Sequence, residues 1–162
     1  MIQVGTRKST LALWQANQVR DHLKKIGYAS KLVAIESLGD KNLVQPIYSM
    51  GIKGVFTKSL DIALLNNKID IAIHSLKDVP TLLPKGIEIS AYLKRDNPYD
   101  IVVHNPKFID WDVCDTIGTG SLRRRAQWMR KFPKHKTENL RGNIQTRLKK
   151  LNKSKWGGAC LL

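Results

Sequence analysis

The stretch Ile71-Ala72-Ile73-His74-Ser75-Leu76-Lys77-Asp78-Val79-Pro80 decides how the chain is interpreted, because a short apolar run changes abruptly to polar residues. An apolar run of this length predicts a buried strand of a parallel sheet. In open α/β sheets, ligands bind beyond the carboxyl ends of such strands. Lys77 and Asp78 are therefore candidate functional residues, and the alternative is an ordinary loop ion pair.

The residues before this strand predict a right-handed βαβ unit. Ile2 to Val4 is a short strand, and Lys31 to Ile35 is a second one. Between them lies an amphipathic helix that ends at Gly27. A further helical pattern opens at Phe56 and leads into the stretch quoted above.

The turn Gly5 to Thr10 stands between the first strand and the first helix. A helix start at the edge of a sheet favours anions, and Arg7 and Ser9 are placed to add side-chain donors. The alternative is a capping turn in which Ser9 or Thr10 caps the helix and Arg7 is solvated.

The chain after Pro80 predicts a second lobe. Ile87 to Leu93 alternates apolar and polar residues, which favours a half-buried strand. Lys94 to Pro98 marks the crossing between lobes. We therefore assign residues 1–95 to a first α/β lobe with the Asp78 loop, and residues 96–162 to a second α/β lobe with basic anion-binding turns.

Two turns of the second lobe repeat the pattern of strand, small polar turn and helix start. Thr116 to Arg125 places glycines and hydroxyls before three consecutive arginines, and Arg141 to Leu148 places Asn143 as an N-cap between arginines. Glycines let backbone N–H groups converge on an anion, and arginine matches carboxylate or phosphate. These turns would face the first lobe across a cleft.

The charge of the chain supports an anionic ligand. Lys and Arg number 28 against 13 Asp and Glu, and residues 101–162 hold 14 basic and 4 acidic side chains. Nucleic acid, an acidic surface and a small molecule with several carboxylates or phosphates all fit this charge. Nucleic acid is disfavoured, because the arginines lie at helix starts instead of along a face with interleaved aromatics.

Other classes of protein are disfavoured by composition. No stretch approaches the roughly 18 apolar residues of a membrane span, and the N-terminus lacks the apolar region of a signal peptide, so we expect a cytoplasmic protein. Cys114 and Cys160 lie far apart without a CxxC pattern, so no metal site is predicted.

Five ordered blocks closely resemble the porphobilinogen deaminase family, also called hydroxymethylbilane synthase. They are GTRKSTLALWQ (residues 5–15), KGVFTK (53–58), DIAIHSLKDVP (70–80), GTGSLRR (118–124) and NLRGNIQTRL (139–148). The resemblance implies a monomeric transferase of tetrapyrrole (heme) biosynthesis that condenses four porphobilinogen units head to tail with release of ammonia. It also implies a two-lobed α/β architecture like that of periplasmic binding proteins, with mainly parallel sheets.

The resemblance also implies roles for individual residues. Asp78 resembles the catalytic aspartate, with Lys77 beside it, Phe56 resembles the aromatic residue that stacks on a pyrrole ring, and the loop ending at Lys53 resembles a mobile lid. The residues expected to hold the carboxylates of substrate and cofactor are Arg7, Ser9, Ser75, Thr119, Ser121, Arg123, Arg124, Arg141 and Arg147, with Gly142 allowing close backbone approach.

The chain departs from the family in two ways. Gly120 stands where the family usually has serine, which removes one hydroxyl and keeps the backbone donors. The chain ends at Leu162, so we expect an incomplete second lobe, no cysteine-bearing third domain, no attachment cysteine for the dipyrromethane cofactor, and an inactive fragment. The alternative function is a two-lobed module that binds a polycarboxylate without catalysis.

Overall fold

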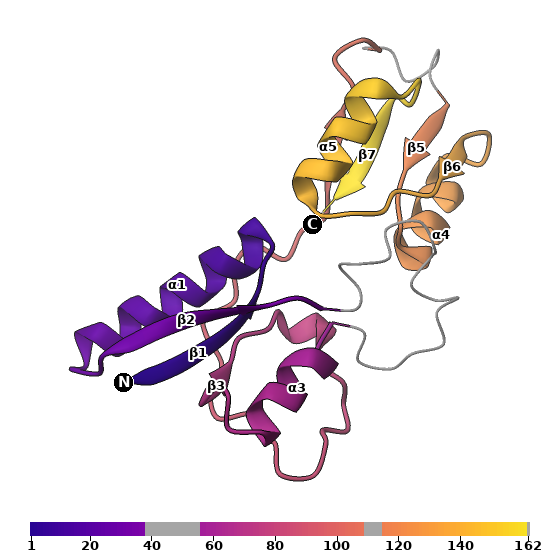
Figure 1. Cartoon of the computed structure of the whole chain (residues 1–162). Coiled ribbons are helices and arrows are strands. Elements are labelled where there is room, and N and C mark those ends of the chain that lie inside the picture. The colour runs from indigo at the N-terminus through magenta and orange to yellow at the C-terminus, as the bar shows by residue number, and fades with distance from the viewer. Residues whose placement is uncertain (38–55, 109–114, 162) are drawn as a thin grey trace. The chain divides into compact units, whose positions relative to one another are not determined.

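A computed structural model of the chain describes residues 1–37, 56–108 and 115–161. The chain divides into two compact units, Met1–Tyr92 and Leu93–Leu162. Figure 1 shows the helices and strands of both units. Each unit contains its own sheet, so each is described separately below.

The first unit contains a parallel sheet in the order β2-β1-β3. Strand β1 (Ile2–Arg7) pairs along its whole length with β2 (Ser30–Ile35), and it pairs on its other side with β3 (Ile71–Ala72). Helix α1 (Thr10–Lys25) connects β1 to β2 (Figure 1). The predicted βαβ unit is therefore present, and its parallel direction is confirmed.

Helix α3 (Lys58–Leu65) supplies part of the core of this unit and leads into β3. The buried cluster consists of Leu60, Ala63 and Ile69, with Val33, Ile35, Leu64 and Ala72 packed against it. The cluster therefore joins one face of α3 to side chains of β2 and β3. This packing positions the end of β3 and the polar residues that follow it.

Local signals define both ends of α1. The Ser9 side chain accepts a hydrogen bond from the backbone N–H of Ala12 at 3.3 Å, as an N-cap does. Beyond the C-terminus Gly27 has a φ of +87°, a left-handed conformation that glycine adopts without steric cost. The predicted cap and stop of this helix are both confirmed.

The first strand is longer than the sequence predicted. Gly5 to Arg7 belong to β1, and Arg7 pairs with Ile35, where we expected a polar turn. The reason is tertiary: the Thr6 side chain is buried and its hydroxyl donates to the carbonyl of Ala12 at 3.0 Å. Because helix α1 satisfies this hydroxyl, a polar residue continues the strand.

The strand predicted for Ile87 to Leu93 is absent, and this prediction was wrong. These residues have no regular secondary structure, and Ile89, Tyr92 and Leu93 are 40%, 68% and 51% exposed. Alternation describes which side chains share a face, but a strand also needs a neighbour for its backbone groups. No strand of the described residues pairs with this segment.

The second unit contains a mixed sheet in the order β4-β7-β5-β6. Strand β5 (Thr116–Gly118) is parallel to β6 (Lys136–Glu138) and to β7 (Gly158–Leu161). Strand β4 (Ile101–His104) is antiparallel to β7. Parallel pairing therefore dominates both sheets, and the predicted α/β class with mainly parallel sheets is confirmed.

Two helices follow the strands of this sheet. Helix α4 (Leu122–Lys131) follows β5, and helix α5 (Ile144–Lys153) lies between β6 and β7. The core consists of Leu140, Leu151, Ala159 and Leu161, with Val103, Leu148 and Trp156 packed against it. All four residues of β7 are buried. No helix of the described residues is long and apolar enough to cross a membrane.

Candidate functional site

The polar residues after β3 form a tight turn. Ser75 precedes a single 3₁₀ turn, η2 (Leu76–Asp78), and the N–H of Asp78 donates to the Ser75 carbonyl at 2.9 Å. Lys77 is exposed, whereas 24% of the Asp78 side chain is exposed. The turn therefore presents the Asp78 carboxylate at a partly enclosed position beyond the carboxyl end of β3.

Arg7 is the nearest described counter-charge to this carboxylate. Its Nη1 lies 3.8 Å from Asp78 Oδ2, and 19% of the Arg7 side chain is exposed. Because β1 and β3 are parallel neighbours, with Gly5 beside Ala72, their carboxyl ends lie at the same edge of the sheet. The sequence prediction that both residues belong to an anion-binding edge is consistent with this arrangement.

Phe56 lies at the same edge. The Arg7 guanidinium lies over its ring, 4.3 Å from the ring centroid, within the range of a cation–π interaction. Such an interaction contributes about 0.5 to 2 kcal/mol, depending on its exposure. In this structure the ring predicted to stack on a pyrrole therefore contacts Arg7.

The two serines assigned to this edge are both engaged within the protein. Ser75 Oγ exchanges hydrogen bonds with the Gln15 side-chain amide at 3.0 and 3.2 Å, and Ser9 caps α1. The Ser9 hydroxyl accepts the capping hydrogen bond and still has its own proton to donate. Ser9 can therefore cap α1 and bind a ligand carboxylate at the same time. Gln15 is a residue that the sequence reasoning missed, although it belongs to the first quoted block.

His74 is a second residue that was not assigned a role. Burial lowers its pKa, whereas Asp61 and Asp78 oppose this and Arg7 adds to it. Its Nε2 is buried and makes no hydrogen bond within the described part of the chain. Burial therefore disfavours the protonated form of this imidazole, on which the charge of the candidate catalytic aspartate acts.

The turn after β5 in the second unit has a defined hydrogen-bond pattern. Thr119 is buried, and its N–H donates to the Glu138 carbonyl at 2.9 Å. Its hydroxyl accepts from the N–H of Ser121 at 3.3 Å, and Ser121 Oγ accepts from the N–H of Arg124 at 3.4 Å as the N-cap of α4. The role of Ser121 as the cap of α4 was not predicted from the sequence, and these two backbone donors are bound by the turn itself.

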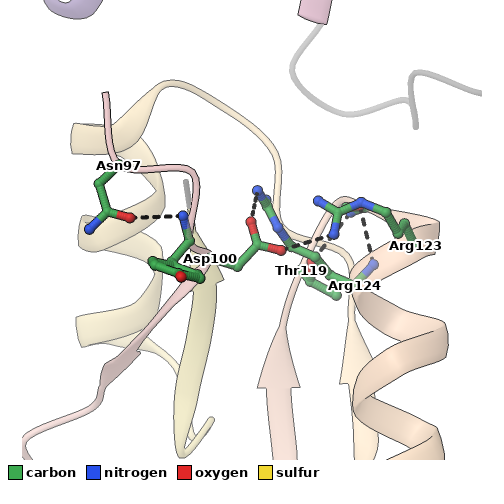
Figure 2. A network of polar contacts seen from close by, with 7 residues as sticks. Asn97, Asp100, Thr119, Arg123 and Arg124 are labelled. Carbon is green, nitrogen blue, oxygen red and sulfur yellow. Dashed lines mark hydrogen bonds and ion pairs between the residues drawn. The ribbon is translucent and has the colours of Figure 1, made fainter. Parts of the chain in front are cut away.

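Arg123 and Arg124, in the first turn of α4, both bind Asp100 (Figure 2). Arg124 Nη2 lies 2.8 Å from Asp100 Oδ1, and Arg123 Nη1 lies 3.1 Å from Asp100 Oδ2. The hydrogen bond from Arg124 is the largest cause that lowers the pKa of Asp100, and burial opposes it. Asp100 was not among the predicted site residues.

The position of Asp100 follows from the direction of β4. Because β4 is antiparallel to β7, with Ile101 beside Leu161, the start of β4 lies at the edge where β5 and β7 end. Asp100, which precedes β4, therefore lies close to Arg123 and Arg124, which follow β5. The only signal in the sequence was an acidic residue directly before an apolar run, which is too common to identify a site.

Arg141 and Arg147 complete the arginines of this unit. Arg141 is 5% exposed, and burial lowers its pKa. Burial is also the main cause that lowers the pKa of Arg147, and the charges of Arg124 and Arg141 add to it. Arg147 therefore lies close enough to both other guanidinium groups to be repelled by them, so this cluster favours a bound anion.

Glycines shape the backbone around these arginines. Gly142 has a φ of +116°, and a Cβ there would lie 2.6 Å from Thr146 Cγ2. The Gly142 carbonyl accepts a hydrogen bond from Arg147 Nε at 2.7 Å. At Gly120 a Cβ would lie 2.6 Å from the Leu140 carbonyl oxygen, so a side chain here would require the backbone to shift.

The structure thus brings the candidate residues together in two groups, one in each unit. Arg7, Phe56 and Asp78 form the first, and Arg124, Arg141 and Arg147 form the second with Arg123 attached through Asp100. Lys53 lies outside the described residues. These features define an α/β protein with arginine-rich turns at the carboxyl ends of its parallel strands.

Comparison with known sequences places the chain in a family. The sequence model described as "Porphobilinogen deaminase, dipyromethane cofactor binding domain" matches residues 2–161. A "Probable porphobilinogen deaminase" of Methanocaldococcus jannaschii is 49% identical over 153 residues, which cover 93% of this chain and 52% of that protein. The chain belongs to the porphobilinogen deaminase family.

Two further relatives agree with this assignment. The "Porphobilinogen deaminase" of Desulfosudis oleivorans is 43% identical over 155 residues, covering 93% of this chain and 49% of that protein. The "Probable porphobilinogen deaminase" of Picrophilus torridus is 43% identical over 157 residues, covering 97% of this chain and 56% of that protein. The chain spans about half the length of these relatives.

The chemistry of the described residues fits one part of the cofactor that the family name implies. Arg124, Arg141 and Arg147 provide clustered guanidinium groups, which suit the carboxylates of a dipyrromethane. Cys160 does not fit as a point of covalent attachment. It is 7% exposed in β7, and burial raises the pKa of its thiol, so the reactive thiolate is disfavoured.

Proposed function

We propose that this chain carries the substrate-binding and catalytic residues of a porphobilinogen deaminase. The reaction is the stepwise head-to-tail condensation of four porphobilinogen units, with loss of ammonia at each addition. The observation that carries the proposal is the Asp78 carboxylate beside Arg7, within a chain whose family match covers residues 2–161.

Asp78 is the catalytic residue of this proposal. Loss of ammonia from the aminomethyl group leaves positive charge on the pyrrole ring, and an ionised carboxylate stabilises that charge while accepting the pyrrole N–H. The lone pairs of a carboxylate allow it to bind Arg7 and the substrate together. Partial enclosure strengthens this interaction, because 24% of the Asp78 side chain is exposed.

The remaining candidates bind the acetate and propionate arms of the pyrroles. Arg7, Ser9 and Ser75 act in the first unit, with Lys77 as an exposed cation next to Asp78. Phe56 offers a ring face for stacking once Arg7 turns toward a carboxylate. In the second unit the carboxylate-binding residues are Thr119, Ser121, Arg123, Arg124, Arg141 and Arg147, with Gly142 shaping the backbone between the last two.

The dipyrromethane cofactor is part of the proposal. When bound, it supplies the terminal pyrrole to which the first substrate is joined. The residues that would hold its carboxylates are the arginines of the second unit. Their supporting feature is the repulsion of Arg147 by Arg124 and Arg141, which an anionic ligand relieves.

The experiment that tests the proposal is substitution of Asp78 in the intact enzyme, with ammonia release and bilane formation measured from porphobilinogen. Asp78→Ala should lower turnover by at least about 10³-fold, because transition-state charge loses its partner. Asp21→Asn is the matched control, since Asp21 lies on α1 with 56% of its side chain exposed. Near-normal turnover of Asp78→Ala, with wild-type circular dichroism, would contradict the assignment.

The proposal also includes a monomer in the cytoplasm with porphobilinogen as its small-molecule substrate. Light scattering of the purified protein measures the first property directly. A concentration-independent mass of one chain is the expected result.

A further inference from the structure

Asp100 binds both of the adjacent arginines that the proposed function assigns to ligand carboxylates. Each of its carboxylate oxygens contacts a different guanidinium, at 2.8 Å for Arg124 and 3.1 Å for Arg123 (Figure 2). A carboxylate of the protein therefore occupies the kind of position that a ligand carboxylate would take. Its role depends on how readily each contact can be exchanged.

The two contacts differ in burial. The Arg124 side chain is 11% exposed, whereas the Arg123 side chain is 59% exposed, and Asp100 itself is 27% exposed. Ion pairs at the surface contribute little stability, because water replaces the partner easily. Breaking an enclosed pair is costly, because it leaves a charge without solvent or partner. The contact with Arg123 is therefore the exchangeable one.

The charge of Arg124 also depends more strongly on Asp100 than that of Arg123 does. The positive charges of Arg124 and Arg147 repel each other, and Arg124 Nε is buried without a hydrogen-bond partner within the described residues. Asp100 is the carboxylate that the described structure pairs with Arg124. Releasing it would leave clustered positive charges in a partly enclosed place, so this contact persists when a ligand binds.

Resting on the proposed function, we propose that Asp100 is a positioning residue with a permanent and an exchangeable contact. It neutralises and orients Arg124 at all times, and it holds Arg123 until an acetate or propionate group of a pyrrole takes that arginine over. Because Asp100 stays nearby, its negative charge weakens the binding of the incoming carboxylate. Asp100 thereby limits how tightly the arginines hold a growing pyrrole chain.

The test measures binding of uroporphyrin I, a fluorescent tetrapyrrole with acetate and propionate arms, to the purified protein at several salt concentrations. Asp100→Asn should tighten binding by about three- to tenfold, because a like charge is removed near the ligand. Arg123→Gln should weaken binding and reduce its salt dependence. In the Arg123→Gln background, Asp100→Asn should have a clearly smaller effect on binding, since the exchangeable contact with Arg123 is already absent.

Asp115→Asn is the matched control for net charge. Asp115 precedes β5, whereas the anion turn follows it, and its pair with Lys136 is exposed. This variant should change affinity by less than about twofold. An equal gain from Asp115→Asn would overturn the proposal, and so would weaker or unchanged binding by Asp100→Asn, or additive effects of Asp100→Asn and Arg123→Gln.

Two further readouts keep the proposal separate from folding and from the proposed function. If Asp100→Asn fails to fold, Arg123→Gln decides alone, since its exposed contact is not needed for folding. If Arg123→Gln has wild-type stability and binds uroporphyrin I more weakly and with less salt dependence, the exchangeable contact is supported. Unchanged binding of uroporphyrin I overturns it. If the wild-type protein does not bind the probe, the carboxylate site of the proposed function itself fails.

Discussion

The carboxylate of Asp78 lies 3.8 Å from the guanidinium of Arg7, and that guanidinium also covers the ring of Phe56 at 4.3 Å. Arg7 thus links the candidate catalytic residue to the candidate stacking residue. The charge of Arg7 acts on the Asp78 carboxylate, and its planar guanidinium packs on the Phe56 ring. Substitutions at this position distinguish the two.

Arg7→Gln removes the charge, and in the intact enzyme we expect it to lower kcat/KM for porphobilinogen by about 10²- to 10³-fold. Arg7→Lys keeps the charge but lacks the planar guanidinium, so it should recover part of the loss. Steady-state kinetics of both variants check this prediction. Arg20→Gln, which alters an exposed arginine on α1, serves as the control and should match the wild type.

The second prediction concerns the pH dependence of stability at His74. Burial lowers its pKa in the folded protein from the ordinary value of 6.5. Below about pH 6.5 the unfolded chain binds a proton that the folded protein binds only at lower pH, so the free energy of unfolding should fall as the pH drops. Above that value the contribution of His74 is constant.

Urea unfolding at about pH 7.5 and about pH 5.5 measures this effect. The loss of stability should be smaller in His74→Gln than in the wild type, because glutamine does not titrate. Asp61, Asp78 and Arg7 act on His74 in the folded state, so their charges are kept in both proteins. His22→Gln is the matched control on exposed helix surface, and an equal effect there would contradict the assignment to His74.

The third prediction separates backbone conformation from packing at two glycines. Gly27 and Gly142 both have positive φ, but a Cβ at Gly27 meets nothing within 4 Å, whereas one at Gly142 lies 2.6 Å from Thr146 Cγ2. Gly27→Ala should therefore cost about 1 to 2 kcal/mol of stability from strain alone. Gly142→Ala should cost more, about 2 to 4 kcal/mol.

Denaturant midpoints of the two variants, each compared with the wild type, give these differences. Gly142→Ala should also raise KM, since the Gly142 carbonyl binds Arg147 at 2.7 Å. Equal costs at both positions would mean that Thr146 moves aside freely.

The fourth prediction concerns the reactivity of Cys160. Its thiol is buried in β7 and burial raises its pKa, so little thiolate is available at neutral pH. In a Cys114→Ser background, Ellman's reagent should modify Cys160 at least about 10²-fold more slowly in the native protein than in urea. Rapid native labelling would show that the strand opens and would restore Cys160 as a candidate attachment point.

Local signals in the sequence predicted much of the fold. Ser9 and Asn143 were each recognised as residues that cap a helix, and both accept a backbone hydrogen bond in that role. These signals work because a cap and its partner N–H lie within a few residues of each other. The strand predicted for Ile87 to Leu93 failed, because a strand depends on a partner that the local pattern does not contain.

The sequence by itself determined the family, the order of the elements and the residue types at the ends of the strands. Only the tertiary structure decided which of those residues meet. The antiparallel direction of β4 brings Asp100 to Arg123 and Arg124, and the parallel pairing of β1 with β3 brings Arg7 to Asp78. Strand direction and neighbours are set by packing across the whole unit, so no local pattern of residues reveals them.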